Sequence, residues 1–227
     1  MRHNRTPSCA ALFDLDGVII DTRAATKEAL RALVLAAAAP VDSAALDACV
    51  MLPPVDALES LGVPGARQAY RDQFDDALSF AIGKLRVFEA VVSGMAALAE
   101  AGAGLGIVTA QSRNRLRYLL PPEVAGLVDV VIAHEDAPAK PAPDGILAAC
   151  TRLGVPVERA LFVGDTPTDV RAARAAEVLA VGAGWGFAGP AVLSTEGVDV
   201  LLTGPDQVGP RVLRHLGGRL IRPAITL

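Results

Sequence analysis

The sequence Cys9-Ala10-Ala11-Leu12-Phe13-Asp14-Leu15-Asp16-Gly17 places five apolar residues directly before two aspartates and a glycine. A short, unbroken apolar run is typical of a strand that is buried on both faces of a parallel sheet. The two carboxylates then fall at the carboxyl end of this strand, and the glycine allows the chain to turn sharply beside them. We therefore predict a buried strand over residues 9–13 that delivers Asp14 and Asp16 to one edge of a sheet.

The same pattern recurs along the chain. Apolar runs at 105–108, 128–133 and 160–164 end at Thr109, His134 and Asp165, and a further run at 178–181 enters a glycine-rich loop. Helical stretches separate these runs, at 91–101, 113–120, 142–153 and 167–176. Strands that alternate with helices indicate an α/β fold with a Rossmann-like parallel sheet and helices on both faces. Ligands of such sheets bind beyond the carboxyl ends of the strands.

One region lacks this alternation. Residues 22–88 are rich in alanine and leucine at helical spacing, and prolines and glycines divide them into about four helices. A helical insertion directly after the first strand suggests a cap over the site. We therefore expect a catalytic core formed by residues 1–21 and 88–227, and an inserted all-helical cap domain formed by residues 22–87.

Composition excludes several classes of protein. The chain has 227 residues, of which 52% are hydrophobic, and a net charge of −4, which is the opposite of a disordered composition. An isoelectric point near 5.4 argues against a nucleic-acid partner. The longest apolar run, residues 32–41, is ten residues long, whereas a membrane-spanning helix needs about 20. Met1 to Arg5 are basic, but Asp14 and Asp16 follow too soon for a signal peptide, so a cytoplasmic protein is expected.

Six residues carry the candidate chemistry. Asp14 and Asp16 follow the first strand, and Asp165 and Asp169 follow a later one. Four acids at one sheet edge would repel one another, so we expect a hard divalent cation with oxygen ligands. Thr109 offers a hydroxyl and Lys140 an ammonium, and both groups suit an anion. Together these residues predict a phosphate site.

Alternative sites are less well supported. Gly184-Trp185-Gly186-Phe187-Ala188-Gly189 matches the G-x-G-x-x-G fingerprint of dinucleotide-binding proteins. However, Pro190 follows at once and no clear amphipathic helix is predicted there, whereas the fingerprint needs a helix N-terminus for the pyrophosphate. The three cysteines are far apart and set among apolar neighbours, so we expect buried thiols rather than a disulfide or a zinc site.

Four motifs resemble the haloacid dehalogenase (HAD) superfamily, in its phosphoglycolate phosphatase-like and β-phosphoglucomutase-like branch with a helical cap. They are residues 13–18 (Phe-Asp-Leu-Asp-Gly-Val), 107–109 (Ile-Val-Thr), 140–144 (Lys-Pro-Ala-Pro-Asp), and 163–166 (Val-Gly-Asp-Thr) with Asp169. The resemblance covers nearly the whole chain. It implies the α/β core and inserted cap described above.

The resemblance also implies roles for individual residues. Asp14 would attack phosphorus to form an aspartyl-phosphate, and Asp16 would protonate the leaving oxygen and then activate water. Mg²⁺ would be held by Asp14, the backbone carbonyl of Asp16 and Asp165, and Asp169 would complete the metal site by holding a metal-bound water or a neighbouring ligand. The phosphoryl group would be bound by Gly17, Thr109, Ala110 and Lys140.

The expected activity is that of a Mg²⁺-dependent phosphatase that hydrolyses a phosphate monoester of a small metabolite, as a monomer or homodimer. One alternative is a sugar phosphomutase of the same fold, although Thr26 stands where those mutases carry a histidine. A second is a non-catalytic metabolite-binding module. Residues 49–54, at the place of the family's cap specificity loop, are apolar, which argues against phosphoglycolate, with its second anionic group, as the substrate.

Overall fold

The computed structural model describes residues 7–220. Met1 to Arg5, which entered the prediction that the chain has no signal peptide, lie outside the described residues. The chain forms two compact units, one from residues up to Ile20 together with those from Val87 onward, and one from Asp21–Arg86. Within the described part of the chain, no helix combines the length and the apolar character that crossing a bilayer requires.

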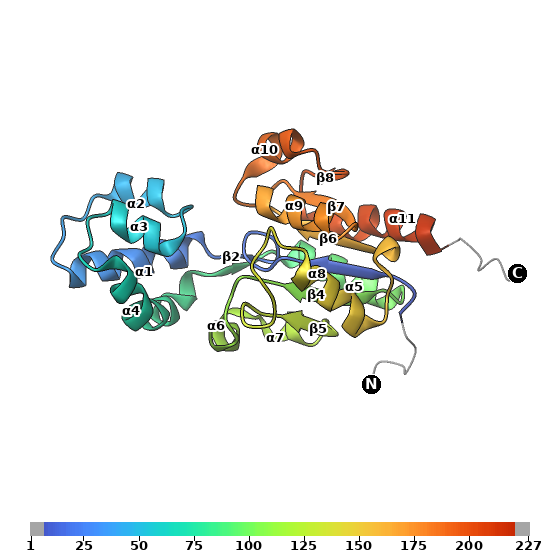
Figure 1. Cartoon of the computed structure of the whole chain (residues 1–227), viewed down its shortest axis with the longest axis horizontal. Coiled ribbons are helices and arrows are strands. Elements are labelled where there is room, and N and C mark those ends of the chain that lie inside the picture. The colour runs from blue at the N-terminus through green and yellow to red at the C-terminus, as the bar shows by residue number, and fades with distance from the viewer. Residues whose placement is uncertain (1–6, 221–227) are drawn as a thin grey trace, which may run out of the picture. The chain divides into compact units, whose positions relative to one another are not determined.

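The larger unit is built on a six-stranded sheet in the order β5-β4-β1-β6-β7-β8 (Figure 1). Every neighbouring pair in it is parallel, which confirms the predicted sheet. Its strands are β1 (Ala10–Phe13), β4 (Gly104–Val108), β5 (Val130–Ile132), β6 (Ala160–Gly164), β7 (Leu179–Ala183) and β8 (Val200–Leu202). The sequence analysis did not predict β8.

The register fixes where the site lies. Phe13, the last residue of β1, is paired with Ile107 of β4 and Val163 of β6. The residues that follow these three strands therefore meet at one edge of the sheet.

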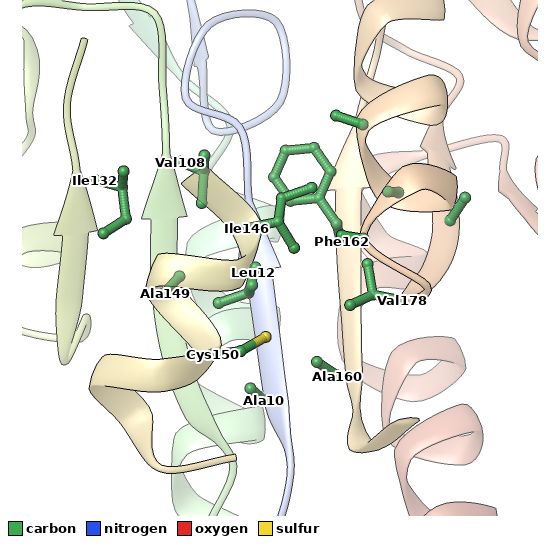
Figure 2. Close-up of a cluster of buried hydrophobic side chains, with 14 of the residues drawn as sticks. Ala10, Leu12, Val108, Ile132, Ile146, Ala149, Cys150, Ala160, Phe162 and Val178 are labelled. Atoms are coloured by element: carbon green, nitrogen blue, oxygen red, sulfur yellow. The ribbon is translucent and has the colours of Figure 1, made fainter. Parts of the chain in front are cut away.

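Helices cover both faces of this sheet, as predicted. They are α5 (Glu89–Glu100), α6 (Arg113–Leu119), α7 (Pro122–Ala125), α8 (Asp144–Leu153), α9 (Pro167–Ala175), α10 (Gly189–Glu196) and α11 (Val208–Leu220), with short 3₁₀ turns at Val157–Arg159 and Pro205–Gln207. Figure 2 shows α8 and α9 in front of the sheet, with α5 and α11 behind it. There Ile146 and Cys150 of α8 lie over Leu12 and Ala10 of β1, in a buried apolar cluster.

One helix corrects the sequence analysis. No clear amphipathic helix was expected after the Gly184–Gly189 loop, but α10 begins at Gly189. Pro190 lies in its first turn, where the missing N–H is not needed for a helical hydrogen bond. Only Leu193 of α10 is buried, so the sequence of this helix has no apolar face to detect.

The smaller unit contains four α-helices, in agreement with the predicted number: α1 (Arg23–Ala36), α2 (Ser43–Cys49), α3 (Pro54–Ser60) and α4 (Ala66–Phe80), followed by a 3₁₀ turn at Ile82–Lys84. Ala25, Ala29 and Leu33 form the buried face of α1, at the spacing of successive helical turns. The segments where the chain enters and leaves this unit, β2 (Ile20–Asp21) and β3 (Arg86–Val87), pair as a two-stranded sheet. The unit is therefore not wholly helical, since two-residue strands leave no periodic signal.

Candidate active site

The strand ends deliver three of the predicted residues to one place. Asp14, Thr109 and Asp165 directly follow β1, β4 and β6. All three are buried, with 8%, 5% and 0% of their surface exposed. The backbone N–H of Asp14 donates to the carbonyl of Val163 at 2.9 Å, which continues the ladder between β1 and β6 to the site. The sheet itself therefore fixes the backbone beneath these side chains.

Lys140 connects two of the acids. It lies in the loop before α8, and its Nζ is 2.9 Å from Asp14 Oδ1 and 2.6 Å from Asp169 Oδ1. The same Nζ donates to the carbonyl of Val108 at 3.3 Å and lies 5.3 Å from the centre of the Phe162 ring. A lysine with only 12% of its side chain exposed therefore has its charge fully engaged by this site.

Asp169 both caps the start of α9 and forms an ion pair with Lys140. Thr166 caps α9, and Asp169 completes a capping box in its first turn. Its Oδ2 accepts from the N–H groups of Asp165 and Thr166 at 3.2 and 3.0 Å and from the Thr166 hydroxyl at 2.6 Å. These bonds turn its other oxygen toward Lys140. The helix-start role and the site role that the sequence allowed for Asp169 are therefore compatible.

Asp165 is enclosed by two glycines. A Cβ atom on Gly17 would lie 2.1 Å from Asp165 Oδ2, and one on Gly186 would lie 2.3 Å from Asp165 Cβ. The N–H of Phe187 donates to Oδ2 at 2.6 Å. The Gly184–Gly189 loop therefore holds an acid of this site, a role that the sequence analysis missed because it tested the loop only as a dinucleotide fingerprint.

The electrostatics favour a cation among the acids. Burial raises the pKa of Asp14 from 3.8 to about 7, although Lys140 opposes the increase. Burial, together with the charges of Asp14 and Asp169, raises the pKa of Asp165 to about 8. Burial alone would lower the pKa of Lys140, but the charges of Asp14 and Asp169 outweigh it and hold this pKa above its usual value. One lysine does not compensate three buried carboxylates.

The same acids fit a divalent cation. Asp14, Asp165 and Asp169 each offer a carboxylate oxygen, and these atoms lie within 4.8 Å of one another. Asp165 Oδ1 is buried and has no hydrogen-bond partner among the described residues. Buried carboxylate oxygens without a donor are what Mg²⁺ prefers as ligands. The Asp16 side chain is not part of this group. The backbone carbonyl of Asp16 therefore stays its predicted metal ligand.

The Asp16 side chain points instead to Gln111. Gln111 Nε2 donates to Asp16 Oδ1 at 3.1 Å and to Oδ2 at 3.0 Å. The sequence analysis gave Gln111 no role, because its partner is 95 residues away and only the adjacency of β1 and β4 brings the two together.

Three of the four predicted phosphate-binding residues line one small cavity. A cavity of about 20 Å³ is lined by Thr109, Ala110, Lys140 and residues 132–134, among others, and this is enough for a water-sized group. Gly17 is not among the lining residues. Its φ is +77° and its N–H donates to the carbonyl of Ile20 at 2.7 Å, so that donor is used within its own turn.

Two curated relatives cover most of the chain. A plasmid-encoded phosphoglycolate phosphatase of Cupriavidus necator is 30% identical over 220 residues, which cover 86% of this chain and 89% of the relative. A phosphoglycolate phosphatase of Rhodospirillum rubrum is 32% identical over 209 residues, covering 82% and 83%.

Solved structures resemble the chain over nearly its full length. A Lactobacillus plantarum protein assigned as a phosphoglycolate phosphatase is 25% identical, with a TM-score of 0.75, and the match covers 92% of this chain and 99% of that one. A β-phosphoglucomutase of Clostridium difficile shares the fold at 17% identity, with a TM-score of 0.71 over 94% and 99% of the two chains. The sequence model of the haloacid dehalogenase-like hydrolases matches residues 11–183. The chain belongs to the haloacid dehalogenase-like hydrolase family.

Proposed function

We propose that this protein is a Mg²⁺-dependent phosphatase that hydrolyses the phosphate monoester of a small metabolite, with Asp14 as the nucleophile. One observation carries this proposal: Lys140 Nζ lies 2.9 Å from Asp14 Oδ1, while Asp165 and Asp169 bring their oxygens within 4.8 Å of the same carboxylate. A nucleophile flanked by one cation and two further acids suits an anionic phosphoryl group.

The metal would be held by the carboxylates of Asp14, Asp165 and Asp169, with the backbone carbonyl of Asp16 as a further ligand. When bound, a divalent cation supplies positive charge that neutralises the phosphoryl oxygens. The unpartnered Oδ1 of Asp165 supports this assignment, because nothing in the described protein satisfies that oxygen.

Two steps then use residues of this chain. In the first, an Asp14 oxygen forms a bond to phosphorus, the bond from phosphorus to the ester oxygen breaks, and Asp16 gives its proton to the departing oxygen. In the second, Asp16 takes a proton from water, whose oxygen attacks phosphorus and releases Asp14 and inorganic phosphate. Lys140 favours the ionised form of Asp14, which the attack requires.

The remaining predicted residues would hold the phosphoryl group. Thr109 and Ala110 line the cavity beside Lys140, and we propose that the Thr109 hydroxyl and the Ala110 backbone N–H donate to phosphoryl oxygens. We propose that the Asp21–Arg86 unit acts as a cap, which excludes bulk water during the reaction and reopens to release products.

Two observations bear on the substrate class, and they favour different esters. The names of the curated relatives make phosphoglycolate a candidate. Against it, Met51 and Leu52 in the apolar 49–54 segment are 45% and 41% exposed, and they favour an ester whose organic part lacks a second anionic group. Both kinds of ester therefore belong in the assay.

The test is phosphate release from a panel of phosphate monoesters, in Mg²⁺ and in EDTA. Wild-type protein should release phosphate only with Mg²⁺, and Asp14→Asn should abolish turnover. Asp206→Asn, which removes the charge of an exposed aspartate, is the matched control and should keep full activity. No release from any ester, or full activity in Asp14→Asn, would refute the proposal. Isomerisation of a hexose phosphate without phosphate release would indicate the mutase instead.

A further inference from the structure

Gln111 is a residue of the site to which neither the motifs nor the proposed reaction gives a role. Its Nε2 donates to both carboxylate oxygens of Asp16, at 3.1 and 3.0 Å. The amide therefore spans from the end of β4 to the end of β1, on the edge that carries Asp14.

The backbone of Gln111 is held on both sides. Its N–H donates to Thr109 Oγ1 at 3.1 Å, and its carbonyl accepts from the N–H of His134, beyond β5, at 3.0 Å. The next residue, Ser112, caps α6 by accepting from the N–H of Arg115. A side chain that starts from a backbone fixed in this way presents its amide to Asp16 in a defined position.

The other end of the same amide is unsatisfied. Gln111 Oε1 is buried and has no hydrogen-bond partner among the described residues. Burial of an amide oxygen without a donor is costly, so stability alone does not account for a glutamine here. The opposite orientation would set Oε1 against the oxygens of the Asp16 carboxylate. The amide is therefore oriented for its N–H group, whose acceptor is Asp16.

We propose that Gln111 is a positioning residue, which holds the Asp16 carboxyl in the orientation needed to pass a proton to the leaving oxygen. The inference rests on the proposed function, in which Asp16 supplies that proton while Asp14 bonds to phosphorus. In this role Gln111 contacts the Asp16 carboxyl and acts on the ester only through it. An ester whose leaving group departs as a stable phenolate does not need the proton and should be indifferent to Gln111.

The experiment compares Gln111→Met with wild type on an alkyl phosphate that the enzyme hydrolyses and on p-nitrophenyl phosphate. The quantity compared is kcat/KM, which reports the steps up to departure of the leaving group, before Asp16 acts on water. We expect kcat/KM for the alkyl ester to fall by about tenfold to a hundredfold, because that is the usual effect of losing a hydrogen bond to a charged group. The value for p-nitrophenyl phosphate should stay within about twofold, because proton donation contributes little there.

Three further comparisons test whether the effect is specific to the Gln111 amide. Gln111→Asn keeps the amide but shortens the side chain by one methylene, and should show the same selective loss. Gln73→Met alters an exposed glutamine of α4 and should leave both substrates unaffected. In an Asp16→Asn background, Gln111→Met should add no further loss on the alkyl ester, because the two residues act as one unit.

Selective loss on the alkyl ester, absent in the Asp16→Asn background, would support the positioning role of Gln111. Equal losses on both esters, no loss on the alkyl ester, or additive losses with Asp16→Asn would overturn the positioning role while leaving the phosphatase in place. A wild-type protein that released phosphate from no ester of the panel would instead remove the proposed function, and this inference with it.

Discussion

Gly17→Ala tests whether the site depends on the close approach of Gly17 to Asp165. Two effects should add. The backbone of Gly17 has φ of +77°, a conformation that costs a residue with a Cβ about 1–2 kcal/mol. The new Cβ would also lie 2.1 Å from Asp165 Oδ2, so the carboxylate must move away from the N–H of Phe187 that it accepts at 2.6 Å.

The second effect is the larger one. Forcing an extra methyl group into a packed site costs about 1–3 kcal/mol, and loss of a hydrogen bond to a charged group costs about 1.5–3 kcal/mol. Because the packing and hydrogen-bond costs overlap, together they should amount to about 2–3 kcal/mol. With the backbone cost added, we expect Gly17→Ala to lower the free energy of unfolding by about 3–5 kcal/mol in total.

Gly102→Ala is the matched control. Gly102 has φ of +87° and no atom within 4 Å of the position of a Cβ, so it should show the backbone cost alone. Urea unfolding of both variants in EDTA gives the difference, which we expect to be about 2–3 kcal/mol. Gly17→Ala should also bind Mg²⁺ more weakly by isothermal titration calorimetry. Equal destabilisation of the two variants, with unchanged Mg²⁺ affinity, would refute the reasoning.

Three further predictions concern the charges of the site. Lys140→Met should lower the free energy of unfolding in EDTA by about 3–5 kcal/mol, because it leaves buried carboxylates unpaired, and should lower kcat by about a hundredfold; Lys84→Met, at an exposed lysine, should do neither. In EDTA the folded protein binds protons more tightly than the unfolded chain, because burial raises the pKa of Asp14 from 3.8 to about 7 and that of Asp165 to about 8. Its stability should therefore fall as the pH rises from about 4 to about 8, and urea unfolding at several pH values that showed a rise would contradict this sign. Mg²⁺ at about a hundred times its Kd should stabilise the wild type by about 2.7 kcal/mol and Asp165→Asn much less, as measured by thermal unfolding; an equal gain in both would place the metal elsewhere.

Much of the larger unit could be predicted from the sequence because its strands are buried on both faces. Apolar runs such as residues 160–164 end abruptly at an acid, and β6 ends at Gly164, directly before Asp165. Where burial is slight the signal disappears. In α10 only Leu193 is buried, and this helix was missed.

The site could be predicted only as far as its residues lie in local motifs. Asp14, Asp165 and Asp169 stand beside strand ends, and the structure brings their oxygens together. The contacts of Gln111 with Asp16 and of Phe187 with Asp165 could not be predicted. Each joins segments that are distant in sequence, and only strand order and side-chain direction bring them together.

The order of strands also affects how the chain is made. Ala10 of β1 pairs with Gly104 of β4 on one side and with Ala160 of β6 on the other. Positions 10 and 160 are 150 residues apart, so β6 is synthesised long after β1. At about 5–20 residues per second, the ribosome needs roughly 8–30 s to supply it. During that interval an apolar strand has an open edge, the kind of segment that chaperones shield from aggregation. Asp14 thus directly follows a strand that is among the first to be synthesised, and that strand gains its second partner only after most of the chain has followed.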